Sequence, residues 1–130
     1  KAKAGRRKQG VIVPADWIVF TNGGKGVKGN GGALYSNGTM YALIEVPDGK
    51  PVIKVTARGA ATGRVWPYMI IGIDGEEVGE MFVDSAEAKE HDFSLDTTGG
   101  LHVLSVTFVN DLSKNGEDRN LFVENVRVVK

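Results

Sequence analysis

The chain is built from short apolar runs, and each run is closed by glycine, proline, aspartate or asparagine. No stretch places an apolar residue at every third or fourth position over several turns, as an amphipathic helix requires. In residues 52–57, a mixed set (Val52, Lys54, Thr56) alternates with an apolar set (Ile53, Val55, Ala57), which is typical of a half-buried strand. Many short strands at close spacing predict an all-β protein, either a sandwich or a barrel.

Further strands are predicted by apolar runs at 40–46, 67–73, 78–83, 101–109 and 121–129. The segment 47–50 (PDGK) has the chemistry of a tight turn. Asp74-Gly75 predicts a hairpin in which 78–83 pairs back on the preceding strand. In 101–109, we expect Leu104, Val106 and Phe108 to face the core. Residues 110–120 are predicted to form a polar loop before the last strand.

Length and composition indicate one folded domain. The chain has 130 residues, of which 42% are hydrophobic and 25% are charged. Lys and Arg number 16 and so do Asp and Glu, so the overall charge does not favour nucleic acid as a partner. No apolar run reaches the roughly 18 residues of a membrane span. Cysteine is absent, which excludes disulfides and thiolate metal sites.

A run of basic residues at the start of the chain predicts where the folded domain begins. Residues 1–10 (KAKAGRRKQG) are predicted to be a linker or a disordered start, and 11–130 a single module cut from a longer protein. Trp17 is expected to be a core or sheet-face aromatic. Gly24, Gly26 and Gly29 have the G-x-G-x-x-G spacing, but no helix follows them, so 22–32 is interpreted as a loop carrying Lys25 and Lys28.

No catalytic constellation is present in the sequence. His91 and His102 each fall in a predicted strand, and nothing beside them resembles a triad. The chain is therefore predicted not to be an enzyme.

The segment 110–120 (NDLSKNGEDRN) is rich in oxygen ligands. Asp111, Glu117 and Asp118 offer carboxylates, and asparagines at 110, 115 and 120 offer amides. Hard cations such as calcium take about six to eight oxygens from such groups. The segment is either a calcium-binding loop or an ordinary solvated loop. A second segment carries Trp66 and Tyr68, which either stack on a sugar or pack in the fold.

A family resemblance rests on an ordered set of motifs. They are 33–38 (ALYSNG), 55–59 (VTARG), 65–69 (VWPYM), 73–75 (IDG), 83–85 (VDS), 107–111 (TFVND) and 117–123 (EDRNLFV). Over about residues 33–130, the chain resembles the calcium-dependent, xylan-binding carbohydrate-binding modules of families 36 and 60. Family members often have aromatic residues just after the Asn-Asp pair, where this chain has Leu112, Ser113 and Lys114.

The resemblance implies an antiparallel β-sandwich of the jelly-roll type. It also implies a secreted, monomeric accessory module of a polysaccharide-degrading enzyme, with no nucleic-acid or membrane partner. A calcium ion would bind vicinal hydroxyls of xylan or a related plant cell-wall glycan. Asp111, Glu117 and Asp118 would be its ligands, and Asn120 a ligand or a loop-fixing residue. Arg119 would lock the loop through a salt bridge or a contact with Trp66.

The remaining candidates for ligand binding are Asn110, Trp66, Tyr68, Lys114 and Arg64. One alternative is a calcium-independent binder of acidic glycan such as pectin, using Lys25, Lys28, Lys114 and Arg64. Another is a structural or adhesion sandwich in which calcium only stiffens loops. The sequence names neither the glycan nor the parent enzyme, and it leaves the number of calcium ions open.

Overall fold

The computed structural model describes residues 11–12, 19–20, 25–26, 31–96 and 99–129. The predicted linker at 1–10, Trp17 and Lys28 lie outside the described residues, as does most of the glycine-rich loop. Within the described part, every regular element is a strand, and no helix is long and apolar enough to cross a bilayer.

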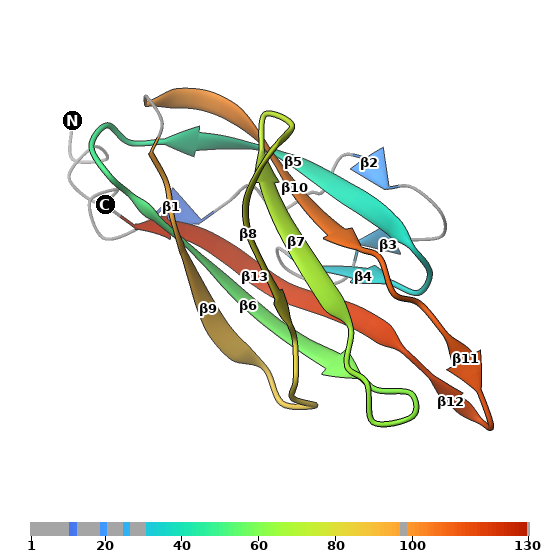
Figure 1. Ribbon diagram of the computed structural model, residues 1–130. Coiled ribbons are helices and arrows are strands. Elements are labelled where there is room, and N and C mark those ends of the chain that lie inside the picture. The colour runs from blue at the N-terminus through green and yellow to red at the C-terminus, as the bar shows by residue number, and fades with distance from the viewer. Residues whose placement is uncertain (1–10, 13–18, 21–24, 27–30, 97–98, 130) are drawn as a thin grey trace.

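Two antiparallel sheets face each other (Figure 1). The first sheet has the order β3-β4-β13-β6-β9, with β1 also pairing with β13, and the second has the order β2-β5-β10-β7-β8. A separate pair, β11-β12, forms a small hairpin. The strands of the first sheet are β1 (Val11–Ile12), β3 (Lys25–Gly26), β4 (Gly32–Leu34), β6 (Val52–Ala60), β9 (Lys89–Ser94) and β13 (Asn120–Val129). Those of the second are β2 (Val19–Phe20), β5 (Gly38–Val46), β7 (Tyr68–Ile73), β8 (Glu76–Phe82) and β10 (Gly100–Phe108), and the hairpin is β11 (Ser113–Lys114) with β12 (Glu117–Asp118).

The core lies between the inner faces of the sheets. Phe108 and Leu104 of β10 are fully buried, as are Ile53 and Val55 of β6. Each strand alternates buried and partly exposed residues because side chains point to opposite faces of a sheet. The predicted β-sandwich of the jelly-roll type is confirmed, as are the predicted facings of β6 and β10.

Two hairpins use the same turn chemistry. Asp74 and Gly75 have φ of 52° and 89° between the paired Ile73 and Glu76, as a two-residue primed turn requires. Asn115 and Gly116 have φ of 54° and 81° between paired Lys114 and Glu117. Residues 110–120 are polar and mostly exposed, as predicted, but they contain a short hairpin where only a loop was expected. The Asn-Gly pair reverses the chain and pairs β11 with β12, despite the polar composition.

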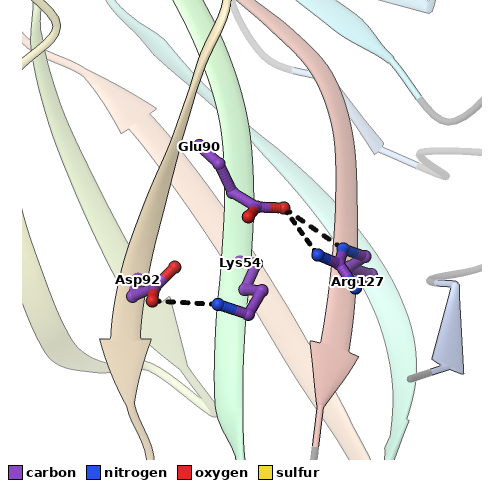
Figure 2. A network of polar contacts seen from close by, with 4 residues as sticks. All are labelled: Lys54, Glu90, Asp92 and Arg127. Carbon is purple, nitrogen blue, oxygen red and sulfur yellow. Dashed lines mark hydrogen bonds and ion pairs between the residues drawn. The ribbon is translucent and has the colours of Figure 1, made fainter. Parts of the chain in front are cut away.

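Ion pairs cover part of the outer face of the first sheet (Figure 2). The Nζ of Lys54 on β6 lies 2.9 Å from the Oδ2 of Asp92 on β9. The Nε and Nη2 of Arg127 on β13 each lie 3.1 Å from the Oε2 of Glu90. Such partly exposed pairs contribute little to stability, at most about 1 kcal/mol each. They do neutralise the cations on this part of the face.

Gly79 on β8 packs directly against Phe93 of the other sheet. A Cβ added at Gly79 would lie 2.7 Å from the Cε1 of Phe93, whose side chain is 8% exposed. We expect Gly79→Ala to lower the free energy of unfolding by about 1–3 kcal/mol, because the ring must leave its position. Urea denaturation measures this. Gly79→Ala should cost less stability in a Phe93→Leu background than in the wild type, because the smaller side chain leaves room for the added methyl group. Strict additivity of the two changes would contradict this packing.

Candidate functional site

The β11-β12 hairpin extends beyond the sheets at the end where the loop between β6 and β7 also lies (Figure 1). Asp118 ends β12 and Asn120 begins β13, so alternation puts their side chains on the same side. The Nδ2 of Asn120 donates a hydrogen bond of 3.1 Å to the Oδ2 of Asp118. The negative charge of Asp118 also acts on Asp111. We call Asp111, Asp118 and Asn120 the oxygen cluster.

Two oxygens of the cluster are buried without a partner. The Oδ1 of Asp111 and the Oδ1 of Asn120 accept no hydrogen bond in the structure. Burial raises the pKa of Asp111, and the charge of Asp118 raises it further, whereas the backbone N–H of Leu112 and the charge of Arg119 lower it. Unsatisfied buried acceptors beside two like charges are costly. Carboxylate and amide oxygens are donors that suit calcium.

Asn37 holds Asp111 from a distant part of the chain. The backbone N–H of Asp111 donates a 2.7 Å hydrogen bond to the Oδ1 of Asn37, which lies in the turn between β4 and β5. Asn37 is not among the site residues predicted from the sequence. The only local signal was its place before Gly38 in a short turn, which does not reveal a partner 74 residues away.

Glu117 lies on the other side of the hairpin from the oxygen cluster. Its neighbour Asp118 belongs to the cluster, and consecutive side chains of a strand point to opposite faces. The Oε1 of Glu117 accepts a 2.8 Å hydrogen bond from the backbone N–H of Gly63. The structure thus joins Asp118 and Asn120 by a hydrogen bond and places Asp111 within reach of the charge of Asp118, whereas Glu117 is directed to the β6–β7 loop. There it lines a hollow of about 240 Å³ with Thr62, Gly63, Val65, Leu112, Lys114, Asn115 and Arg119.

Arg119 joins the hairpin to the β6–β7 loop. Its side chain is buried, with 6% of the residue exposed, and the guanidinium donates to three backbone carbonyls. The acceptors are the oxygens of Val65 at 2.9 Å, Thr62 at 2.8 Å and Asn110 at 2.5 Å. The loop-locking role expected of Arg119 is seen, but the partners are carbonyls. Among the described residues no carboxylate forms an ion pair with it.

Asn110 uses its side-chain amide to hold the start of β7. Its Oδ1 accepts from the backbone N–H of Tyr68 at 2.8 Å, and its Nδ2 donates to the carbonyl of Trp66 at 3.0 Å. Tyr68 lies on the outer face of the second sheet, where its ring meets that of Phe82 with centroids 4.7 Å apart. A hydrogen bond to Glu80, burial and the nearby carboxylates raise the pKa of Tyr68 to about 12.

Three further predicted ligand-binding residues are Trp66, Arg64 and Lys114, of which only Lys114 lines the hollow. Trp66 is half-buried, whereas Arg64 and Lys114 are exposed. Arg64 has a φ of 68° in the β6–β7 loop, and Lys114 lines the hollow. Lys114 pairs with Glu117 across the hairpin, so both lie on the side opposite Asp118.

Both histidines lie in strands, as predicted. His102 on β10 places its Nδ1 2.5 Å from the Oδ2 of Asp74, and Asp74 also accepts from the backbone N–H of Val103. These contacts lower the pKa of Asp74, with the Val103 hydrogen bond contributing most. Burial lowers the pKa of His91 on β9. Among the described residues, no three His, Cys, Asp or Glu side chains gather as a metal cluster, so the oxygen cluster depends on amide oxygens as well.

Comparison with solved structures shows which proteins share this fold. The CBM36-1 domain of a multidomain xylanase from the hindgut metagenome of Trinervitermes trinervoides is 13% identical with a TM-score of 0.70, covering 94% of this chain and 98% of that chain. The C-terminal CBM6 of LamC, a marine laminarinase from Zobellia galactanivorans, is 11% identical with a TM-score of 0.68, covering 94% of this chain and 100% of that chain. Carbohydrate-binding module CBM36 in complex with calcium and xylotriose is 14% identical with a TM-score of 0.51, covering 92% and 97%. At these identities the likeness shows the fold, a β-sandwich shared with carbohydrate-binding modules.

The family itself is shown by the sequence. A model of family CBM60, described as a Ca-dependent carbohydrate-binding module, xylan-binding, matches residues 52–130. That range is more than half of the chain, and the chain belongs to this family of carbohydrate-binding modules. The matched range includes all three residues of the oxygen cluster. The family resemblance predicted from the sequence is confirmed. No curated protein matches the chain.

Proposed function

We propose that this module binds xylan or a related plant cell-wall glycan through a calcium ion held by the oxygen cluster. The observation that carries the proposal is the pair of buried, unpartnered oxygens on Asp111 and Asn120 beside the carboxylate of Asp118. When bound, calcium supplies coordination positions that two neighbouring sugar hydroxyls can fill in place of water. Family membership supports the same ion and the same class of glycan.

The other residues of the site prepare it for the ion. Asn37 fixes the backbone of Asp111, and the Asn120 amide fixes the carboxylate of Asp118. Arg119 holds the carbonyl of Asn110, next to Asp111, against the β6–β7 loop. Because these contacts already hold the ligand side chains, little conformational entropy is lost when the ion binds. We assign Glu117 to the contact between the hairpin and the β6–β7 loop and not to the calcium site, because its carboxylate accepts a hydrogen bond from Gly63.

We infer that the module serves as a monomeric accessory domain of a secreted polysaccharide-degrading enzyme. Its affinity for a single chain segment is expected to be modest, about 0.01–1 mM, because few polar contacts are made. Attachment to a catalytic domain then keeps that domain close to a polymer with repeated sites. The enzyme supplies the chemistry, and the module supplies retention.

The direct test is affinity electrophoresis through xylan with and without EDTA. We expect retardation in calcium, free migration in EDTA and recovery when excess calcium is restored. Isothermal titration with xylotriose gives the same comparison in solution. Retardation that persists in EDTA but disappears in salt would instead support the acidic-glycan alternative through Lys114 and Arg64. A chelator-sensitive melting temperature without any glycan binding would support the structural alternative.

A further inference from the structure

The β11–β12 hairpin reverses the chain at an asparagine-glycine pair that is open to solvent. Asn115 and Gly116 are both exposed, and Asn115 lines the hollow. A Cβ built on Gly116 would meet no atom within 4 Å. Among the described residues, none forms a hydrogen bond with the side-chain amide of Asn115. The amide and the following peptide nitrogen are therefore accessible to water and base.

This pair has a spontaneous reaction of its own, because glycine puts no side chain beside its nitrogen. The backbone nitrogen of Gly116 loses its proton to base and attacks the Cγ of Asn115. The N–Cγ bond forms, the Cγ–Nδ2 bond breaks, and the amide nitrogen leaves as ammonia, which gives a cyclic imide. Water then opens either side of the ring and yields aspartate or isoaspartate, so neither an oxidant nor a reductant takes part.

The closed hairpin keeps Asn115 out of the reactive geometry. Asn115 and Gly116 have φ of 54° and 81°, the left-handed conformation of a primed turn. In that conformation ψ is about 47°, which turns the Gly116 nitrogen away from the Asn115 side chain, whereas ring closure requires that nitrogen to eclipse Cβ. The turn must therefore open before the imide forms.

The tip of the hairpin is held by few contacts. β11 and β12 have two residues each, and all four are exposed. The base is firmer, because Arg119 is buried and its backbone N–H donates a 2.9 Å hydrogen bond to the carbonyl of Leu112. A short exposed ladder of this kind opens locally while the rest of the domain stays folded.

The same dipeptide at Asn37-Gly38 is restrained. The Oδ1 of Asn37 accepts a 2.7 Å hydrogen bond from the backbone N–H of Asp111. Gly38 begins β5 and pairs with Phe108 of β10. The side-chain carbonyl and the following peptide are thus both fixed, so this pair serves as an internal comparison.

We propose that Asn115 is a site of spontaneous conversion to aspartate and isoaspartate, which proceeds when the hairpin tip opens and which a calcium ion bound by Asp118 slows. The protection by calcium rests on the proposed function, whereas the reaction rests on the turn alone. Asp118 ends β12, so an ion held there disfavours the open tip. Isoaspartate routes the main chain through Cβ and lengthens the turn by one carbon. The two-residue turn between Lys114 and Glu117 is then lost, and Asp118 is displaced.

The test is incubation in warm, mildly alkaline buffer, with calcium or with EDTA, followed by peptide mapping. Trypsin releases Asn115 in the peptide 115–119, apart from Asn22 and Asn30, which also precede glycine and lie outside the described residues. In EDTA, we expect Asn115 to convert at least about tenfold faster than Asn37, because only the tip opens readily. Calcium at about 100 times its dissociation constant should slow the conversion of Asn115 about 100-fold.

The modified protein should also lose calcium affinity. Protein aged in EDTA should bind calcium about 10–100-fold more weakly than fresh protein, as when the support of a metal ligand is removed. Asn115→Gly retains a turn-compatible pair without the amide, so its calcium affinity should survive the same incubation. Fresh Asn115→Asp has a normal backbone and should bind calcium within about threefold of the wild type, which assigns the loss to isoaspartate.

The outcomes separate this inference from the function beneath it. An unmodified Asn115 after incubation in EDTA, in protein that still binds calcium, overturns the inference alone. Conversion at equal rates with and without calcium overturns the protection, and a wild-type protein that binds no calcium overturns the proposed function. Faster conversion at Asn37 than at Asn115 contradicts the role given to the open tip. Should Asn115→Gly fail to fold, wild-type protein aged in calcium replaces it as the unmodified control.

Discussion

Replacing Asp111 with asparagine is expected to weaken calcium binding by about 100-fold and, with it, to abolish measurable glycan binding. Asp111 supplies one of the two carboxylates of the oxygen cluster, and charge count is a main determinant of calcium affinity. Its Oδ1 is buried without a hydrogen bond. Asparagine keeps the shape and a carbonyl oxygen but removes the charge. Isothermal titration with calcium alone, then with xylotriose, measures both effects.

The same substitution should leave the calcium-free protein at least as stable as the wild type. The pKa of Asp111 is raised by burial and by Asp118, so its ionised form is disfavoured in the folded state. Asparagine carries no charge and removes that cost. A metal ligand would give two results together. Without calcium, the variant would be more stable than the wild type, and added calcium would stabilise the wild type but not the variant. Thermal unfolding with and without calcium measures it.

Glu117→Gln is the matched control for Asp111→Asn. Glu117 is in the same hairpin, but its carboxylate accepts from Gly63 on the opposite side. We expect the glutamine variant to retain calcium and xylotriose affinity within about threefold, because no ligand charge is lost. Calcium binding that survives Asp111→Asn but fails in Glu117→Gln would place the ion in the hollow beside the β6–β7 loop and contradict the oxygen cluster.

Arg119→Met is expected to lower the free energy of unfolding by about 3–5 kcal/mol. The buried guanidinium satisfies the carbonyls of Val65, Thr62 and Asn110. Methionine fills much of the same volume but donates nothing, so those acceptors lose their partner. Each buried unsatisfied acceptor costs about 1–3 kcal/mol, and water reaching the loops recovers part of that. Chemical denaturation followed by tryptophan fluorescence gives the value.

Arg64→Met is the control for Arg119→Met. Arg64 belongs to the same loop region but is exposed, so its loss should change stability by no more than about 0.5 kcal/mol. Arg119→Lys should fall between the wild type and Arg119→Met, because one ammonium cannot match the fork of a guanidinium. A loss below about 1 kcal/mol in Arg119→Met would mean that the carbonyls find other partners, which would contradict the locking role.

Local pattern was sufficient for the strands that form the core. Residues 52–57 alternate so regularly that the buried face of β6 followed from the sequence, and the same holds for Leu104, Val106 and Phe108 of β10. Turn chemistry predicted the Asp74-Gly75 hairpin correctly. The Asn115-Gly116 turn has the same chemistry, yet its polar surroundings led to the prediction of a loop. At this position the Asn-Gly dipeptide predicts the hairpin correctly, whereas the polar composition does not.

The sequence by itself determined that this protein is all-β and that its oxygen ligands concentrate before the last strand, because both properties are carried by residues close together in the chain. Only the tertiary structure decided which of those ligands face one another. The hairpin sends Glu117 and Asp118 to opposite sides. Asn37 and the carbonyls around Arg119 likewise come from other loops. Such contacts depend on the register between strands far apart in sequence, which no local pattern encodes.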